Sequence, residues 1–172
     1  FGYGAAPGAT GKIKIGDNVH TTWIGGNSEW HNVSDGRFKR NVREDVPGLN
    51  FILKLRPVTF QWNNEKLERF IGAADAVLNN SDAESKALVS KNEQKICTGF
   101  IAQEVEEAAQ KTGYDFDGVY HPQQSHDVYS LAYAEFVVPL VKAVQEQQKQ
   151  IDELKQIIKE QQKTIRQLER AR

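Results

Sequence analysis

The sequence has little of several features that would narrow its function. Cysteine occurs once in 172 residues, at Cys97, so no disulfide can form within the chain. No run of apolar residues approaches the roughly 20 that cross a membrane as a helix, and no signal peptide is visible. The net charge is only −1, which gives no broad electrostatic case for binding nucleic acid or an anionic membrane. We therefore expect neither of these partners.

The composition points to a small domain with extended parts. The hydrophobic fraction is 39% and the mean hydropathy is −0.60, which are low values for a compact globule. The polar C-terminal part accounts for much of this. The chain lacks an initial Met and begins with a Gly-, Ala- and Pro-rich stretch, residues 1–11, so we expect the C-terminal fragment of a longer protein.

A heptad repeat occupies the C-terminal part of the chain. The a positions are Val137, Val144, Ile151, Ile158 and Ile165, and the d positions are Leu140, Gln147, Leu154, Gln161 and Leu168. Five heptads without a slip predict a coiled coil, and such an exposed helix needs partner chains because it has no core of its own. Ile and Val at a with Leu at d favour dimers. The two Gln residues at d and Ile157 at g weaken that preference, so the pattern leaves the number of chains open.

The remaining patterns predict short strands and helices, and hence an α+β domain followed by a long C-terminal helix. Expected strands are residues 12–15, 20–24, 58–62, 96–101 and 128–133, with a hairpin over 34–42. Expected helices begin at Pro47 and cover 64–78, 102–111 and the end of the chain, with a loop or frayed helix over 79–94 and an irregular stretch over 114–127. The inward residues of the first two helices are expected to be Leu49, Ile52, Leu53 and Leu55, and then Leu67, Phe70, Ile71, Ala74 and Leu78.

The stretch from Ser34 to Val42 carries the strongest candidate for chemistry. Asp35-Gly36 is a turn signal, because Gly tolerates positive φ and Asp can hydrogen-bond its own backbone. If residues 35–38 form a hairpin loop, Ser34 and Lys39 become a cross-strand pair with Cβ atoms roughly 5 Å apart. A hydroxyl beside an amine can serve as a nucleophile and its general base. Taken alone, the pair is more typical of a solvated, inert hairpin.

Three motifs follow one another in a specific order. They read Ser-Asp-Gly-Arg-Phe-Lys over 34–39, Leu-Arg-Pro-Val-Thr-Phe-Gln-Trp over 55–62, and Gly-Phe-Ile-Ala-Gln-Glu-Val over 99–105. With the heptad helix, they resemble the peptidase S74 family, the intramolecular chaperone of endosialidase and related phage tail fibres and tailspikes. The resemblance covers residues 30 to about 170. Phe38 stands where Leu is expected, and the insert between the second and third motifs carries no motif of the family.

The resemblance implies a function for the Ser34–Lys39 pair. It implies self-cleavage of the Val33–Ser34 bond, with Ser34 as nucleophile and Lys39 as general base. Burial, or a cation such as Arg37 or Arg40, would make the lysine available as a base. The partners it implies are two further copies of the chain, in a trimeric coiled coil, and the upstream fibre shaft of the same polypeptide.

The resemblance also implies a division of the chain and a setting. Residues 1–33 would be the end of the β-rich fibre shaft, 34–135 the intramolecular chaperone and auto-processing domain, and 136–172 the coiled coil. The domain would drive trimerisation and folding of the fibre and then release itself. This would take place in the cytoplasm of a bacterial host, after which the fibre becomes part of the virion tail and the released domain does not.

Two other interpretations stay open. One is a structural trimerisation cap of a fibre protein that is not cleaved. The other is a eukaryotic membrane-tethered transcription factor that uses the same self-cleaving domain. The second fits less well, since no membrane-spanning segment is visible after the coiled coil.

The histidines give weaker signals than the Ser–Lys pair. His31 lies three residues before Ser34 in a segment that looks extended, which places the two side chains on opposite faces. His121 and His126 have no cysteine nearby, so we expect no zinc site.

The remaining candidate residues favour structural roles. Cys97, next to Ile96, is typical of a buried small hydrophobe. Glu104, Glu106 and Glu107 are predicted to form a solvated helix face. No phosphate-binding loop of the Walker type is visible, and we expect no cofactor and no metal.

Overall fold

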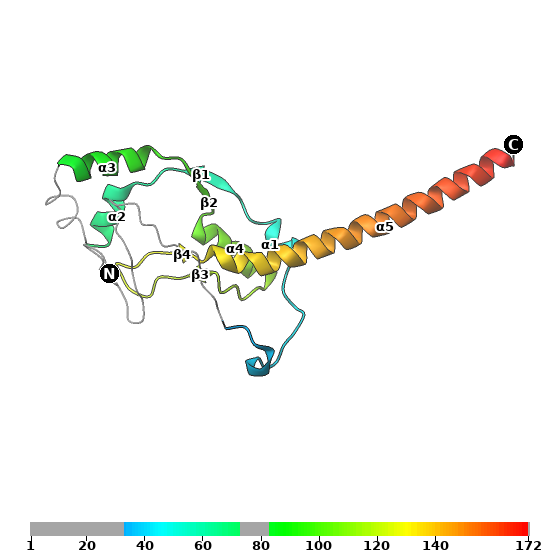
Figure 1. The fold of residues 1–172 in the computed structure, drawn as a ribbon, viewed down its shortest axis with the longest axis horizontal. Coiled ribbons are helices and arrows are strands. Elements are labelled where there is room, and N and C mark those ends of the chain that lie inside the picture. Colours follow the sequence, from blue (N-terminus) through cyan, green and yellow to red (C-terminus); the bar gives the residue numbers. More distant parts are fainter. Residues whose placement is uncertain (1–32, 73–82, 172) are drawn as a thin grey trace. The chain divides into compact units, whose positions relative to one another are not determined.

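The structure, a computed structural model, describes residues 33–72 and 83–171. These residues form an α+β fold of short strands, helices and a long C-terminal helix, which confirms the predicted class (Figure 1). The elements are the 3₁₀ turn η1 (Gly36–Phe38), α1 (Leu49–Ile52), β1 (Val58–Phe60), α2 (Asn64–Phe70), α3 (Ala83–Gln94), β2 (Cys97–Gly99), α4 (Ala102–Thr112), β3 (Val119–Tyr120), β4 (Ser130–Leu131), the 3₁₀ turn η3 (Tyr133–Phe136) and α5 (Val137–Arg170). The strands expected over 12–15 and 20–24, and His31, lie outside the described residues.

The chain divides into two compact units. The first comprises Phe1–Val42, Pro57–Ile101 and His121–Ser130, and the second comprises Arg43–Arg56, Ala102–Tyr120 and Leu131–Arg172. Strands β1 and β2 and helices α2 and α3 belong to the first unit, whereas α1, α4, η3 and α5 belong to the second.

In the first unit, β1 and β2 form an antiparallel pair. Their register sets Val58 opposite Gly99 and Phe60 opposite Cys97. Both predicted strands are confirmed, although β1 ends at Phe60 and does not reach Trp62. The Trp62 ring packs edge-on against Phe60, with ring centroids 5.3 Å apart.

Polar contacts hold the start of α2. The Asn63 side chain accepts a hydrogen bond from the backbone N–H of Lys66 at 2.8 Å, as a favoured N-cap residue does. The carboxylate of Glu93, on α3, accepts another from the backbone N–H of Asn64 at 2.8 Å. These bonds satisfy N–H groups that the first turn of a helix leaves without partners, and the second one ties α3 to α2.

The helix predicted for residues 64–78 ends early, and its most buried residues are polar; the expected inward residues Leu67 and Ile71 are half-buried. It ends at Phe70, and Gly72 then adopts a φ of +76°, a left-handed conformation that commonly follows a helix. Asn64 and Glu68 are its buried residues, whereas Phe70 is 49% exposed. Apolar spacing could not identify Asn64 and Glu68 as buried, because both residues are polar. Residues 73–78 lie outside the described part.

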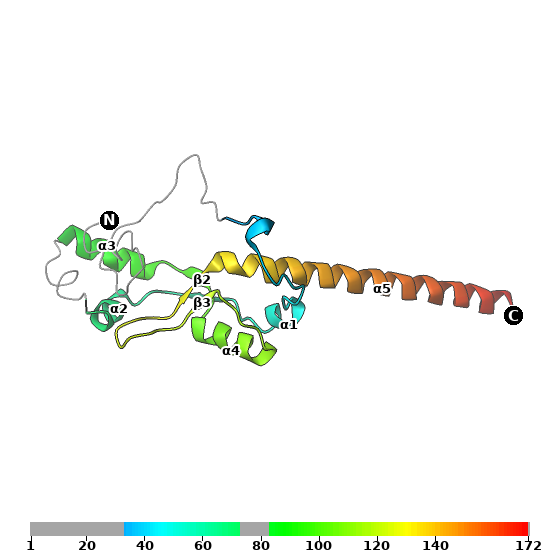
Figure 2. The same ribbon diagram turned by 90° about the horizontal axis from the view of Figure 1, so that it is seen from below.

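An aromatic cluster forms the core of the second unit. The ring of Phe51, on α1, is fully buried, and its centroid lies 5.2 Å from that of Tyr114 and 5.0 Å from that of Phe116. Phe136, in η3, completes the cluster with a centroid 4.8 Å from that of Phe116. The buried residues of α4 share one face and are Val105, Ala108 and Ala109. Figure 2 shows α1 and α4 beside the first turns of α5, and α1 contacts both helices.

The short helix predicted from Pro47 is present, and three of the four residues expected to face inward, Leu49, Ile52 and Leu55, are half-buried. It covers Leu49–Ile52, with Gly48 as its N-cap residue. Phe51 is its buried residue, whereas Leu53, expected inside, is 75% exposed. One helical turn is too short for apolar spacing to fix its orientation, so packing into the aromatic cluster decides it.

The helices predicted over 102–111 and at the end of the chain are both confirmed, as α4 and α5. Gly113 follows α4 with a φ of +65°, which is the predicted helix end. Helix α5 runs for 34 residues without a break, about 51 Å at 1.5 Å per residue. Strand β4 lies within the predicted strand 128–133, and it pairs with β3, which lies in the stretch predicted to be irregular.

Candidate functional site

Ser34 and Lys39 meet through a 3₁₀ turn, and the predicted β-hairpin is wrong. The predicted hairpin segment contains no strand and forms η1 instead. The carboxylate of Asp35 starts this turn by accepting a hydrogen bond from the Arg37 N–H at 2.9 Å. The turn closes with a 3.1 Å bond from the Lys39 N–H to the Gly36 carbonyl. The chain thereby reverses, and Lys39 Nζ donates a hydrogen bond of 2.8 Å to Ser34 Oγ.

Within the turn, the guanidinium of Arg37 forms an ion pair with Asp35. The Arg37 side chain donates to both carboxylate oxygens of Asp35, with distances of 2.6 to 3.1 Å. This bonding lowers the pKa of Asp35 and raises that of Arg37. The guanidinium carbon also lies 5.7 Å from the centroid of the Phe38 ring. The positive charge of Arg37 is therefore paired with Asp35.

The Ser–Lys pair is open to solvent in the single chain. Ser34 and Lys39 are both exposed, and Val33, whose carbonyl precedes Ser34, is 89% exposed. The peptide bond between Val33 and Ser34 is therefore accessible to the hydroxyl next to it. The geometry therefore provides an exposed contact between a serine hydroxyl and a lysine amine.

Sequence reasoning missed a contact between the second and third motifs. The guanidinium of Arg56 donates two hydrogen bonds to the carboxylate of Glu104, at 3.0 and 2.5 Å. Two parallel bonds of this kind fix the geometry of both side chains. The pair lowers the pKa of Glu104 through these hydrogen bonds. Glu104 is thus a partner of Arg56, not part of the predicted solvated face, while Glu107 forms an exposed ion pair with Lys111 at 2.6 Å.

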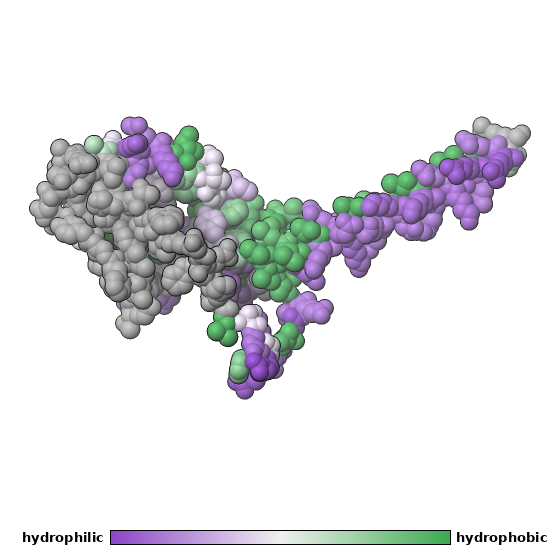
Figure 3. All heavy atoms as spheres, viewed as in Figure 1, coloured by the Kyte–Doolittle hydropathy of each residue, from purple (hydrophilic) through white to green (hydrophobic). Residues whose placement is uncertain are grey.

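The apolar seam of α5 is uncovered. Helix α1 packs on a different face, where Pro139 and Ala143 are buried and Glu146 is half-buried. The ten a and d positions named above are all exposed, including Val144 at 61% and Leu154 at 58%. Figure 3 shows hydrophobic atoms along one edge of the helix and hydrophilic atoms over the rest of the visible face. An exposed apolar seam of this length is typical of helices that pack against other helices.

The two histidines in the described residues are both hydrogen-bonded. A hydrogen bond of 2.9 Å joins His121 Nδ1 to the Tyr129 hydroxyl, and one of 3.0 Å joins His126 Nδ1 to the Phe70 carbonyl. The described part of the chain holds no group of three or more His, Cys, Asp or Glu residues placed to bind a metal ion. Among its helices, none is both long and apolar enough to span a membrane.

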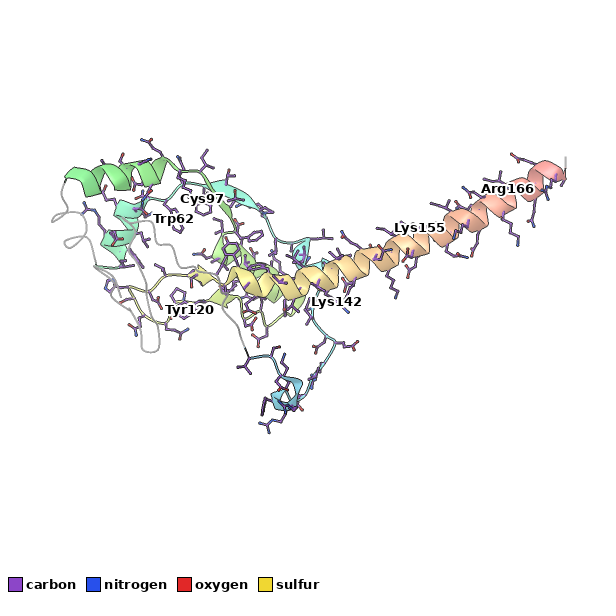
Figure 4. All side chains as sticks on the ribbon, in the orientation of Figure 1. Trp62, Cys97, Tyr120, Lys142, Lys155 and Arg166 are labelled. Carbon is purple, nitrogen blue, oxygen red and sulfur yellow. The ribbon has the colours of Figure 1, made fainter. Side chains whose placement is uncertain are left out.

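Cys97 lines a cavity in the first unit and is half-buried, which is more open than predicted. The cavity has a volume of about 360 Å³, and two of its lining residues, Trp62 and Cys97, are labelled in Figure 4. Its lining residues are Trp62, Asn64, Leu67, Asn92, Lys95 and Cys97.

The fold and the Ser–Lys contact define a class of protein: an α+β domain with a nucleophile–amine pair directly after an accessible peptide bond, followed by a long helix with an open apolar seam. Residues 34–114 match the family model Peptidase_S74, described as the chaperone of endosialidase. The match begins at Ser34 and includes Lys39, Arg56 and Glu104. No curated protein and no solved structure matches the chain.

Proposed function

We propose that this chain is a self-cleaving intramolecular chaperone of a phage tail fibre or tailspike. The observation that carries the proposal is the 2.8 Å hydrogen bond from Lys39 Nζ to Ser34 Oγ. The family match supports it, because the family is the chaperone of endosialidase and the matched segment starts at Ser34. In this proposal Ser34 is the nucleophile, Lys39 is the general base, and the bond cut is Val33–Ser34.

The chemistry proceeds through an ester within the chain. Lys39, as a neutral amine, takes the hydroxyl proton while Ser34 Oγ attacks the carbonyl carbon of Val33. The C–N bond then breaks, and the proton passes from Lys39 to the leaving nitrogen, which becomes the amino group of Ser34. Val33 is now held to Ser34 Oγ as an ester. Water hydrolyses the ester and leaves a carboxylate on Val33 and a free hydroxyl on Ser34.

Assembly would switch this chemistry on. Lys39 is exposed in the single chain, and burial favours the neutral form of a lysine. The exposed seam of α5 needs partner chains to cover it, and the family resemblance favours a trimer. We propose that trimerisation supplies the burial, so that cleavage follows assembly.

The coiled coil gives the domain its chaperone role. A β-rich shaft must bring its chains into register before its non-local contacts return any free energy, so it folds slowly and tends to aggregate. A helix built from local contacts forms early, holds the chains together and raises their effective concentration. Scission then removes the assembly aid and leaves the shaft kinetically trapped. We place this process in the bacterial host cytoplasm, with the finished fibre in the virion tail.

The direct test is the mass of the purified chain. The parent sequence should yield two fragments, the second of which begins at Ser34. Ser34→Ala should leave the chain intact, whereas Ser125→Ala, which changes another exposed serine, should cleave normally. A product that begins elsewhere, or normal cleavage of Ser34→Ala, would overturn the assignment.

A second candidate is a trimerisation cap that does not cleave itself. The exposure of both Ser34 and Lys39 in the single chain supports it, since many serine–lysine contacts at a surface are inert. A stable trimer of the parent sequence that stays uncleaved over days would establish this alternative.

A further inference from the structure

The segment after Lys39 contacts helix α5 closely at Gly48 and Leu49, which lie against Ala143 and Glu146; this contact is called the joint below. The backbone N–H of Leu49 donates a hydrogen bond of 2.7 Å to the Glu146 carboxylate, 97 positions further along the chain. This N–H belongs to the first turn of α1 and has no partner within that helix. Glu146 thus takes the place of an N-cap side chain, which Gly48 cannot supply.

Glycine is required at position 48 for this close approach. A Cβ atom there would lie 2.6 Å from Glu146 Oε2 and 2.8 Å from the backbone nitrogen of Ala143. The first atom ends a side chain and could shift, but the second belongs to the backbone of α5. Gly48 and Ala143 are both buried, so the two segments meet without space between them.

The joint is the first fixed point after the Ser–Lys pair. From Val33 to Asp45 every residue is exposed except Asp35, which is half-buried, and Gly48 is the first buried residue. Gly48 lies nine positions after Lys39, and a fully extended chain of that length reaches about 30 Å. The length of chain between Lys39 and the joint therefore limits the distance between the Ser34–Lys39 pair and α5.

We propose that Glu146 is a positioning residue for self-cleavage, which couples assembly of α5 to the Ser34–Lys39 pair through the contact with Leu49 and Gly48. This inference rests on the proposed function. Glu146 occupies a c position of the heptad repeat, outside the a and d seam, so its side chain is free to hold α1 when partner chains cover the seam. Assembly would then carry the pair to its working position through a short tether.

The test follows the cleaved fraction over time during cell-free synthesis. Glu146→Ala should slow cleavage at least about tenfold, as expected for loss of a hydrogen bond to a charged group. Glu146→Gln keeps an oxygen that accepts from Leu49 and should cleave within about threefold of the parent. The matched control is Glu153→Ala, one heptad further along the same face, which should cleave normally. All variants should stay oligomeric by light scattering.

A second variant separates positioning from stability. Four Gly and Ser residues inserted between Arg43 and Glu44 leave the Glu146 contact intact but lengthen the tether, and should slow cleavage several-fold. The same insertion between Gln124 and Ser125 should have no such effect. Parent-like cleavage in Glu146→Ala, or a Glu146→Gln variant as slow as Glu146→Ala, would overturn this inference alone. An uncleaved parent chain would overturn the proposed function together with it.

Discussion

Arg56 holds Glu104 by two hydrogen bonds, although 48 positions separate the two residues in the chain. Arg56 belongs to the second sequence motif and Glu104 to the third, so this contact is where the two motifs meet in the second unit. Both side chains are partly exposed, at 63% and 40%. The pair fixes the start of α4 relative to the chain that follows α1, and its energy is reduced by the surrounding water.

The Arg56–Glu104 pair predicts that the stability of the fold falls slightly in acid. The pKa of Glu104 is lowered by Arg56, so its stabilising contribution is present above the ordinary value of 4.5 and is lost as the pH falls below it. Glu104→Gln should therefore lower the melting temperature by a few degrees at most at neutral pH, and by less in acid. The measurement is thermal unfolding at neutral pH and at about pH 3. Glu153→Gln is the control, and equal losses for Glu104→Gln at both pH values would contradict the prediction.

The packing of the hydrophobic core predicts different losses of stability for substitutions at Phe51 and Leu53. Phe51→Ala should destabilise the domain by about 3–5 kcal/mol, because it removes a fully buried ring from the aromatic cluster. Leu53→Ala should cost less than about 0.5 kcal/mol, since that side chain is 75% exposed. Urea denaturation of both variants decides the matter. Reversed effects would mean that α1 faces the other way.

The role of Lys39 can be separated from its contact with Ser34. Lys39→Arg keeps a positive group that can donate to the serine hydroxyl, but a guanidinium does not give up its proton. We expect Lys39→Arg and Lys39→Ala to be equally uncleaved when their masses are measured. Arg40→Ala, an exposed neighbour, should cleave normally. Substantial cleavage of Lys39→Arg would mean that the lysine acts by its charge and not as a base.

The seam of α5 predicts self-association. Ile151→Asp with Ile158→Asp would bury charges between chains at a cost of several kcal/mol, so this variant should be monomeric and uncleaved. Gln145→Asp with Gln156→Asp adds the same charge outside the a and d positions and should assemble normally. Light scattering measures both. A monomeric parent chain would end the assembly model.

The chaperone role predicts a loss of yield. A parent fibre that lacks residues 34–172 should aggregate, because its chains no longer meet in register. The same fibre with Ser34→Ala should form a trimer that keeps the domain attached and unfolds faster on heating than the cleaved form. Soluble trimer per cell is the quantity to compare. Equal yields with and without the domain would show that it is an appendage.

Elements with long or strongly marked patterns could be predicted from the sequence. Helix α5 follows its heptads, α4 ends at Gly113, and β1 and β2 fall inside their predicted ranges. In each case a repeated pattern or a glycine with positive φ acts locally, without help from distant residues. The Ser34–Lys39 contact was also predicted, but by a hairpin, whereas the Asp35 side chain starts a 3₁₀ turn that achieves the same reversal.

The resemblance to the family, the pairing of serine with lysine and the seam of α5 could all be predicted, because they depend on residue type and spacing alone. Which side of each short helix faces inward depends instead on contacts that form in the folded chain. Phe51, not Leu53, enters the core because three aromatic residues distant in sequence surround it. The bond from Leu49 to Glu146 and the pair of Arg56 with Glu104 join residues 97 and 48 positions apart. No local pattern encodes such contacts, since they exist only after the chain has folded back on itself.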